Sequence, residues 1–339
     1  MKYLALTLFA SMLFMATTAS AQNLESLGGQ SGVLLVRTVP ARPTPHQFVT
    51  VIIESFSIDL DRSNISWFLN NNLSKDASNQ KTFSFKTGGP GSTSNILIVV
   101  KTFEGEVIQE TLNIRPATVD VLWEAESYVP PFYKGKSLYP FQGTVKIVAL
   151  PNIVTAGGGT LSAKNLVYNW KVDGHPATAA SGYGKNFIFF RGDIPLKAAN
   201  ITVEVSSVDQ SYVAEGNTVI TPVQPGIVFY EDSPLLGVLQ NRALFGNITL
   251  RDEEIKIVAI PYFVGVTERE GRGLSYNWRL NEQKITGSLD KSALSFRQEK
   301  ESAGNARVSL EVSSPSRIFQ TVTSEISLLF GNPAGVSIF

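Results

Sequence analysis

The stretch LVYNWKVDG (residues 166–174) returns about a hundred residues later as LSYNWRLNE (residues 274–282). Aligning Trp170 with Trp278 gives a spacing of 108 residues (278 − 170). Two flanking blocks repeat in the same order: KIVALP (146–151) with KIVAIP (256–261), and ITVEVSS (201–207) with VSLEVSS (308–314). Three blocks in one order at nearly one offset identify an internal duplication.

A third, fainter copy precedes these two. In NISWFLNN (64–71), Trp67 stands 103 residues before Trp170 (170 − 67), between the apolar runs VTVIIESF (49–56) and ILIVVKT (96–102). Proline-containing links at Pro116 and at Pro222–Pro225 separate the copies, and such links are semi-rigid. We therefore predict a signal peptide, three domains and a short tail, with the bounds 1–21, 27–116, 117–224, 225–330 and 331–339.

The runs within each copy are short, alternate apolar with polar residues, and are bounded by Gly, Pro, Asn or Asp. This pattern is typical of sandwich strands, and no helical periodicity follows the N-terminal segment, so the chain is expected to be all-β. A Trp in a central strand with polar neighbours has its ring on one face of the sheet. We expect Trp67, Trp170 and Trp278 to be buried between the two sheets of their sandwiches.

The run Tyr-x-Trp-x-apolar-Asp-Gly, followed by a strand of the type Val-x-Val-x-Ser, resembles the immunoglobulin-like and PKD-like β-sandwich repeats of bacterial exported proteins. YNWKVDG with ITVEVSS carries the resemblance most clearly, and it extends over nearly the whole chain after the N-terminal segment. It implies three tandem immunoglobulin-like domains. Such domains mostly act as spacers, adhesion modules or assembly parts, and the fold alone does not choose among these roles.

The N-terminus has one Lys, an apolar run from Tyr3 to Ala16, and then Ala19-Ser20-Ala21. This order is typical of a secretory signal peptide cleaved before Gln22. The alternative is a membrane anchor, but the apolar run is shorter than the roughly 20 residues that a spanning helix needs. We expect an exported protein of the periplasm, cell surface or medium, without a transmembrane segment in the mature chain.

Composition excludes several classes of function. The chain has no Cys, which removes thiol catalysis, thiolate metal sites and disulfides. Its 29 basic and 29 acidic residues give a formal charge of zero, so the cationic footprint of a nucleic-acid-binding protein is missing.

No pattern of catalytic or metal-binding residues emerges. His46 and His175 lie in unrelated positions of different copies, each beside a Pro. The stretch beginning at Asp59 has calcium-loop spacing at its start but lacks the Gly and Glu of an EF-hand, so a polar turn is expected there. Glu124 and Glu231 are repeat equivalents, which indicates a structural role. We predict no catalytic residue, no cofactor and no metal, although a cation at a domain junction stays open.

One segment departs from its repeat equivalent. SYVPPFYKGKSLYPF (127–141) is rich in rings where the third copy has the Leu-rich SPLLGVLQNRALF (233–245). Its rings could form a ledge for a carbohydrate or a partner chain, or they could pack over the sandwich edge or a domain junction. The candidate binding residues are Tyr128, Phe132, Tyr133, Tyr139 and Phe141.

The expected function is therefore a non-catalytic structural or interaction role at the cell envelope, as a spacer, an adhesion module or a subunit of a surface assembly. The alternatives are a carbohydrate- or peptide-binding module that uses the 127–141 loop, and an exported hydrolase built on sandwiches. A protein or a cell-surface polysaccharide is the expected partner, and the oligomeric state stays open.

Overall fold

The computed structural model describes residues 34–130, 132–192, 196–250, 253–266, 273–286, 291–298 and 303–331. The predicted signal peptide, and the predicted tail after Gly331, lie outside the described residues. The chain forms two compact units. One contains the residues up to Ala41, Thr50–Ser84 and Asn95–Asn113, and the other contains Arg42–Val49, Phe85–Ser94 and the chain from Ile114 onward.

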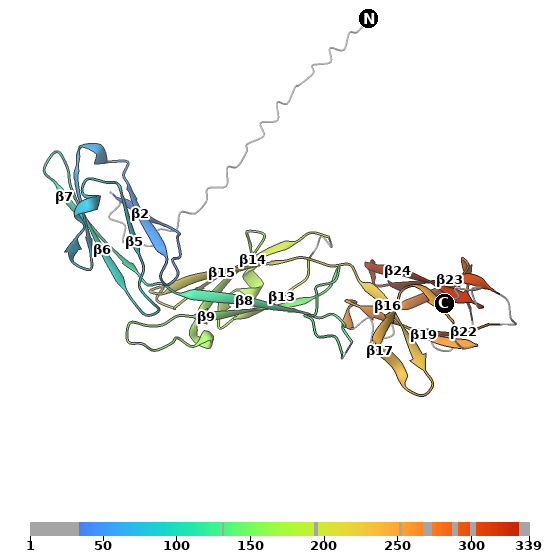
Figure 1. Cartoon of the computed structure of the whole chain (residues 1–339). Coiled ribbons are helices and arrows are strands. Elements are labelled where there is room, and N and C mark those ends of the chain that lie inside the picture. Colours follow the sequence, from blue (N-terminus) through green and yellow to red (C-terminus); the bar gives the residue numbers. More distant parts are fainter. Residues whose placement is uncertain are drawn as a thin grey trace, which may run out of the picture. The chain divides into compact units, whose positions relative to one another are not determined.

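The described chain is built of β-strands in three successive sandwiches of two sheets each, and all strand pairs are antiparallel except β18 with β24, which is parallel (Figure 1). Sandwich one has a three-stranded sheet of β1 (Leu35–Val39), β2 (Phe48–Glu54) and β5 (Thr82–Lys86). Its second sheet has the order β4 (Asn72–Leu73), β3 (Asn64–Leu69), β6 (Ser94–Lys101) and β7 (Val107–Ile114).

Sandwich two repeats this arrangement. Its three-stranded sheet has the order β13 (Phe187–Phe190), β9 (Val145–Asn152) and β8 (Thr118–Ala125). The second sheet has the order β11 (His175–Pro176), β10 (Val167–Val172), β14 (Ala199–Ser206) and β15 (Val213–Ile220), and β12 (Gly182–Tyr183) also pairs with β10.

Sandwich three has the strands of sandwich one and two more. One sheet has the order β17 (Gly237–Leu244), β16 (Gly226–Ser233), β19 (Glu254–Tyr262) and β22 (Ala293–Arg297). The other has the order β18 (Gly246–Thr249), β24 (Arg317–Phe330), β23 (Gly304–Ser314), β20 (Ser275–Leu280) and β21 (Gln283–Lys284). Strands β17 and β18 have no counterpart in the other sandwiches. The three folds confirm the predicted tandem immunoglobulin-like architecture.

Two proline-containing links connect successive sandwiches. Pro116 lies between the end of β7 and the start of β8, and Pro222–Pro225 lies between β15 and β16. Within the described residues, one-turn 3₁₀ helices connect strands at Leu60–Arg62, Lys75–Ala77, Ala163–Asn165 and Thr178–Ala180. Asp59 caps the first of these by accepting a hydrogen bond from the backbone N–H of Asp61 at 3.0 Å, which makes the predicted polar turn.

Each of the three repeated tryptophans is buried in the core of its sandwich, at the position that the repeat predicts. Trp67, Trp170 and Trp278 are 0%, 1% and 3% exposed, and they occupy the equivalent strands β3, β10 and β20. Each indole Nε1 donates to a backbone carbonyl just before or near the last strand of the opposite sheet; the acceptors are Gln80, Lys185 and Lys291, all at 2.9 Å. The ring therefore fills the core, and its one polar atom links the two sheets.

A second feature recurs three residues after each tryptophan. Asn70, Asp173 and Asn281 have φ of 50°, 49° and 47°, a region that Asn and Asp tolerate better than most residues. Each side-chain Oδ1 accepts a hydrogen bond from the backbone N–H of one residue in the neighbouring strand, which is β6, β14 or β23. The backbone N–H of Asn70, Asp173 and Asn281 in turn donates to the carbonyl of that same partner residue. The partners are Asn95, Asn200 and Arg307, at 2.8–2.9 Å. The polar residue after the Trp strand is thus an acceptor that fixes the turn.

Candidate functional site

The loop between β8 and β9, where sandwich two departs most from its repeat equivalents, is held in place by two serines. The Ser127 hydroxyl lies 2.7 Å from that of Ser137 and 2.6 Å from the Leu138 carbonyl oxygen. The Ser137 hydroxyl reaches the carbonyl oxygens of Ala125 and Ser127 at 3.0 and 2.9 Å. Ser127 is 6% exposed, so these bonds satisfy a buried hydroxyl and close the base of the loop.

A cation–π contact anchors the middle of the loop to strand β8. The Lys136 Nζ lies 3.2 Å from the centroid of the Trp123 ring. Burial of the ammonium lowers the pKa of Lys136, and the negative charge of Glu124 opposes that shift. Together with the serines, this contact attaches residues 127–138 to sandwich two.

Tyr139 does not lie on the surface, which corrects the expectation that it contributes to an exposed ledge. It is 2% exposed and belongs to the core of sandwich two. Its ring centroid lies 6.2 Å from that of Phe190, and its hydroxyl accepts a hydrogen bond from the backbone N–H of Gly192 at 3.0 Å. The ring turns inward because the core beneath the loop has room for it and the hydroxyl finds a backbone donor.

Phe132 and Tyr133 contact sandwich three instead of facing solvent. The Phe132 ring meets Tyr230 edge-on, with centroids 5.8 Å apart. Tyr133 meets Tyr262 at 5.9 Å and Phe263 at 5.8 Å, also edge-on. Centroid separations and interplanar angles of this kind are those at which aromatic pairs attract one another.

The backbone at the start of the loop also joins sandwich three. Tyr128 N–H donates to the Val264 carbonyl at 2.7 Å, and the Tyr128 carbonyl accepts from Phe263 N–H at 2.8 Å. Ser127 and Gly265 form an antiparallel bridge next to this pair. Tyr128 packs against the core of sandwich three, so this candidate residue also belongs to the junction.

Two tyrosine hydroxyls lie under the rings of the loop. The Tyr230 and Tyr262 oxygens are 2.9 Å apart, and both residues are buried. Burial raises the pKa of Tyr262, and the hydrogen bond with Tyr230 adds to the shift. Because each buried hydroxyl has the other as its partner, neither carries the cost of an unpaired polar group.

The end of the loop makes a second set of polar contacts with sandwich three. The side-chain amide of Gln320 donates to the Phe141 carbonyl at 2.8 Å, and its oxygen accepts from Gly265 N–H at 3.1 Å. Gln320 is 1% exposed; its bond to Phe141 crosses the junction, and its bond from Gly265 holds the amide in place within sandwich three. The Gln142 carbonyl accepts from Arg317, and the Gln142 side chain accepts from Phe319 N–H at 3.2 Å.

The structure therefore brings four of the five predicted residues, Tyr128, Phe132, Tyr133 and Phe141, to one junction and places Tyr139 in a core. Sequence reasoning missed the partners in sandwich three. A signal was present, since Tyr262 and Phe263 stand where the second copy has Asn152 and Ile153 (an offset of 110 in each case). A ring pair that replaces a smaller pair in the repeat could have indicated a contact unique to sandwich three.

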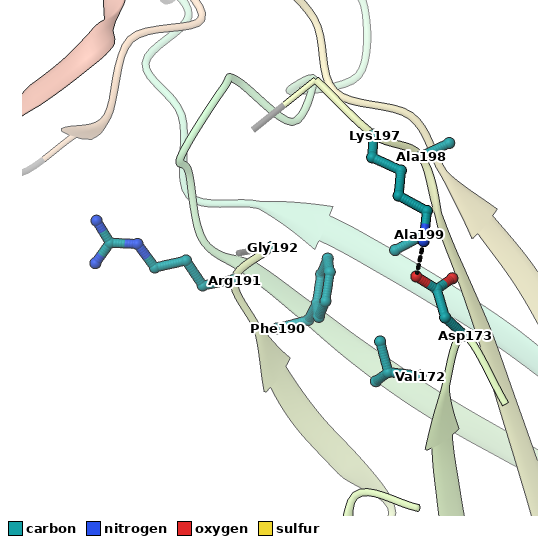
Figure 2. A pocket seen from close by; sticks show the side chains of 8 residues that line it. All are labelled: Val172, Asp173, Phe190, Arg191, Gly192, Lys197, Ala198 and Ala199. Atoms are coloured by element: carbon teal, nitrogen blue, oxygen red, sulfur yellow. Dashed lines mark hydrogen bonds and ion pairs between the residues drawn. The ribbon is translucent and has the colours of Figure 1, made fainter. Parts of the chain in front are cut away.

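A pocket of about 150 Å³ lies at one end of sandwich two, beside Asp173 (Figure 2). Lys197 Nζ and Asp173 Oδ2 are 2.8 Å apart across it. The Arg191 side chain extends away from the other residues that line the pocket (Figure 2). The charges inside the pocket thus neutralise each other, and the arrangement fits the turn described above better than a binding site.

The Asp173 carboxylate gives a testable pH effect. Its hydrogen bonds from Lys197 and from the Asn200 backbone hold the pKa of Asp173 below its usual value. A depressed folded-state pKa stabilises the fold above the unfolded-state pKa, and this stabilisation is lost as the pH falls through the folded-state pKa. We expect Asp173→Ala to lower the urea midpoint of sandwich two at pH 7, because the turn loses its acceptor.

Asp173→Asn is the matched variant, because Asn occupies this position in the other two copies. It keeps the acceptor for Asn200 and loses only the charge, so it should lie between wild type and Asp173→Ala at pH 7. The difference between wild type and Asp173→Asn should shrink as the pH is lowered. A difference that is unchanged between pH 7 and pH 3 would contradict this account.

The remaining sequence candidates have structural positions. His175 is exposed in the two-residue strand β11, and Glu124 lies opposite Lys146 in the register of β8 and β9. Glu231 pairs with Arg242 at 3.4 Å. Among the described residues, no group of three His, Cys, Asp or Glu is placed to hold a metal ion. No helix in the described part of the chain is long and apolar enough to cross a membrane.

No protein-family model matches the chain, and no curated protein does. Among solved structures, the three N-terminal domains of the Highly Immunogenic Outer Capsid protein (Hoc) of bacteriophage RB49 match 88% of this chain and 99% of their own, at 13% identity and a TM-score of 0.27. The fibronectin(III)-like modules of Clostridium thermocellum CbhA match 56% of this chain and 94% of their own, at 14% identity and a TM-score of 0.26. The central fibronectin-III array of RIM-binding protein matches 85% of this chain and 93% of its own, at 12% identity and a TM-score of 0.28. Similarity at this level assigns no function, and the fold follows from the sheets themselves.

Proposed function

We propose that the chain is a non-catalytic structural or interaction protein of the cell envelope, exported as a spacer, an adhesion module or a subunit of a surface assembly. The observation that carries this proposal is the use of residues 127–142, which join sandwich two to sandwich three. A segment that differs between repeats is where a specific function is expected, and here that segment is engaged in holding domains together.

The junction supports a load-transmitting role. It combines edge-on ring contacts from Phe132 and Tyr133, a backbone bridge beside Tyr128, and the buried amide of Gln320. Contacts of three kinds on one loop oppose bending more strongly than a proline link alone, because each must break for the sandwiches to separate. Sandwiches two and three then act as one semi-rigid segment.

The same geometry weakens the two alternatives. A carbohydrate- or peptide-binding ledge needs free ring faces, whereas Tyr139 is in a core and the Phe132 and Tyr133 rings are half-buried against other rings. An exported hydrolase that cleaves glycosidic bonds needs a pair of acids facing one cleft. The repeat-related Glu124 and Glu231 instead lie at equivalent ends of β8 and β16, beside Lys146 and Arg242.

Chemical cross-linking in the native cells tests this proposal. A tagged copy of the chain, treated with a cross-linker that does not pass the inner membrane, should be recovered from the envelope fraction in adducts of discrete mass. An unrelated exported β-sandwich in the same cells serves as the control and should give no such adducts. Recovery of the chain as a free monomer in the periplasm or medium would overturn the assembly role.

A further inference from the structure

Two segments of sandwich one belong to the same compact unit as sandwiches two and three. They are residues 42–49, which end in β2, and residues 85–94, which connect β5 to β6. Backbone bonds hold the two segments together, since His46 N–H donates to the Gly88 carbonyl at 3.0 Å and Thr87 N–H donates to the Gln47 carbonyl at 2.9 Å. We call these two segments the base of sandwich one.

Arg42 of the base forms an ion pair with Glu204 of β14. The Arg42 Nε and Nη2 atoms both donate to the Glu204 Oε2, at 3.0 and 2.8 Å. The two side chains are 11% and 21% exposed, so the pair is largely shielded from solvent. Loss of either partner would leave the other charge both desolvated and unpaired, which is costly.

Glu204 also has a second acid beside it on sandwich two. Glu215 of β15 is its direct partner in the register of β14 and β15. Like charges directly opposite each other on neighbouring strands are destabilising. The base holds Arg42 and Lys86 and no acidic residue, a net charge of +2 (2 − 0) with His46 neutral. The base and these two acids are therefore complementary in charge.

The repeats indicate that the sandwich itself does not require this glutamate. The register of the central strands places three residues at equivalent positions, namely Val99, Glu204 and Glu311. In sandwich three, the Glu311 Oε1 accepts a hydrogen bond from the Asn277 Nδ2 of the same sheet at 3.3 Å. In sandwich two, the equivalent glutamate binds Arg42 of the preceding sandwich. The partner of this repeated residue thus differs between the copies.

Two further contacts join sandwich two to the base and to the link that follows sandwich one. Gly91 has a φ of 80°, and a Cβ there would lie 2.9 Å from the Val154 Cγ1, so this close approach requires glycine. Arg115 of the link donates from Nη1 to the Ser211 carbonyl at 2.8 Å, and its guanidinium carbon lies 5.0 Å from the centroid of the Tyr212 ring.

We propose that Arg42, Gly91 and Arg115 form a latch that holds the base of sandwich one in one position on sandwich two, with the Arg42–Glu204 ion pair as its main contact. The latch depends on charge, whereas the junction of sandwiches two and three depends on rings, a backbone bridge and Gln320. A change of charge should therefore release the latch and leave that junction closed. The inference goes beyond the proposed function, because the latch would act in the same way in any role of the chain.

Distances between spin labels at Phe48→Cys in the base and Leu122→Cys on β8 test the latch in the whole chain. Both positions are mostly exposed, at 72% and 58%. The otherwise wild-type chain should give one narrow distance peak. Arg42→Glu and Glu204→Arg each place like charges together, so each variant should lose that peak. The double variant Arg42→Glu with Glu204→Arg restores a pair of opposite charges and should regain it.

Two further variants separate the latch from general effects of charge. Arg37→Glu is the matched control, because it reverses one charge of the Arg37–Glu54 pair, whose side chains are 42% and 45% exposed, and it should keep the narrow peak. Gly91→Ala changes no charge, but its methyl group would overlap Val154, so this variant should lose the peak.

A second pair of labels shows whether the loosening is local. Labels at Lys171→Cys and Thr323→Cys span the junction of sandwiches two and three, and they should keep their narrow peak in Arg42→Glu. The inference would be overturned by a broad distribution in the wild type, an unchanged peak in Arg42→Glu or Gly91→Ala, a double variant that stays broad, or a loss of the second peak. Any of these results would leave the proposed envelope role standing, since cross-linking in cells tests that role separately.

Discussion

Trp170→Ala is expected to lower the free energy of unfolding of sandwich two by about 3–5 kcal/mol, the range for truncating a large buried ring. Trp170 is 1% exposed and lies among Val203, Val205 and Ile147 in one core. Truncation leaves a cavity between the sheets and removes the Nε1 donor from the Lys185 carbonyl at 2.9 Å. A typical domain is stable by only about 5–15 kcal/mol, so one substitution should remove a large share of the stability.

Hydrogen exchange followed by mass spectrometry locates the effect. Peptides from β9 and β14 should exchange much faster in Trp170→Ala, while peptides from β3 and β6 should exchange at the wild-type rate. Trp170→Phe keeps most of the apolar volume and loses the hydrogen bond, so its free energy of unfolding should lie between those of the wild type and Trp170→Ala. Phe189→Ala, at a 59% exposed position of the same sandwich, should change the stability by less than about 1 kcal/mol. A similar loss for Phe189→Ala and Trp170→Ala would contradict the role of the indole as the core plug.

The second large effect is expected at the junction of sandwiches two and three. Phe132→Ala with Tyr133→Ala removes three edge-on ring contacts, each worth about 0.5–1.5 kcal/mol beyond the area buried. The polar contacts of Gln320 remain, but alone they should not prevent relative motion of the two sandwiches. We expect the double variant to fold and to have a looser junction.

Distances between spin labels measure this motion directly. The chain has no cysteine, so Lys171→Cys on β10 and Thr323→Cys on β24 give two specific labels at exposed positions. The distance distribution should be narrow in the otherwise wild-type chain and clearly broader with Phe132→Ala and Tyr133→Ala. Phe187→Ala with Phe189→Ala removes an exposed ring pair from the same sandwich and is the matched control. An equally narrow distribution in the junction variant would show that the rings do not hold the sandwiches together.

The sandwich fold was predictable because its signals are local and repeated. A strand with one buried face alternates with period two, and the three tryptophans recur at one place in that pattern. Only the structure shows that the Oδ1 of the polar residue three positions after each tryptophan accepts a hydrogen bond from the neighbouring strand. That bond requires φ near 50° and a donor about 25 residues further along the chain, which the residue type alone does not specify.

The 127–141 loop shows where prediction from the sequence ends. Its composition indicates that the rings must contact something, but an irregular segment has no period that fixes the direction of each side chain. Tyr139 turns into the core of its own sandwich, while Tyr133, six residues earlier, contacts Tyr262 across the junction. Both destinations place a ring against other aromatic rings, so composition alone could not separate them.

The sequence by itself determined that this chain is a duplicated β-sandwich with a Trp plug in each copy, because those features depend on neighbours within a strand. Only the tertiary structure decided which residues of sandwiches two and three contact one another. The contacts of Tyr133 with Tyr262, and of Gln142 with Phe319, join residues far apart in the chain. Each depends on two surfaces that exist only after both sandwiches have folded, and for that reason no local pattern in the sequence could specify them.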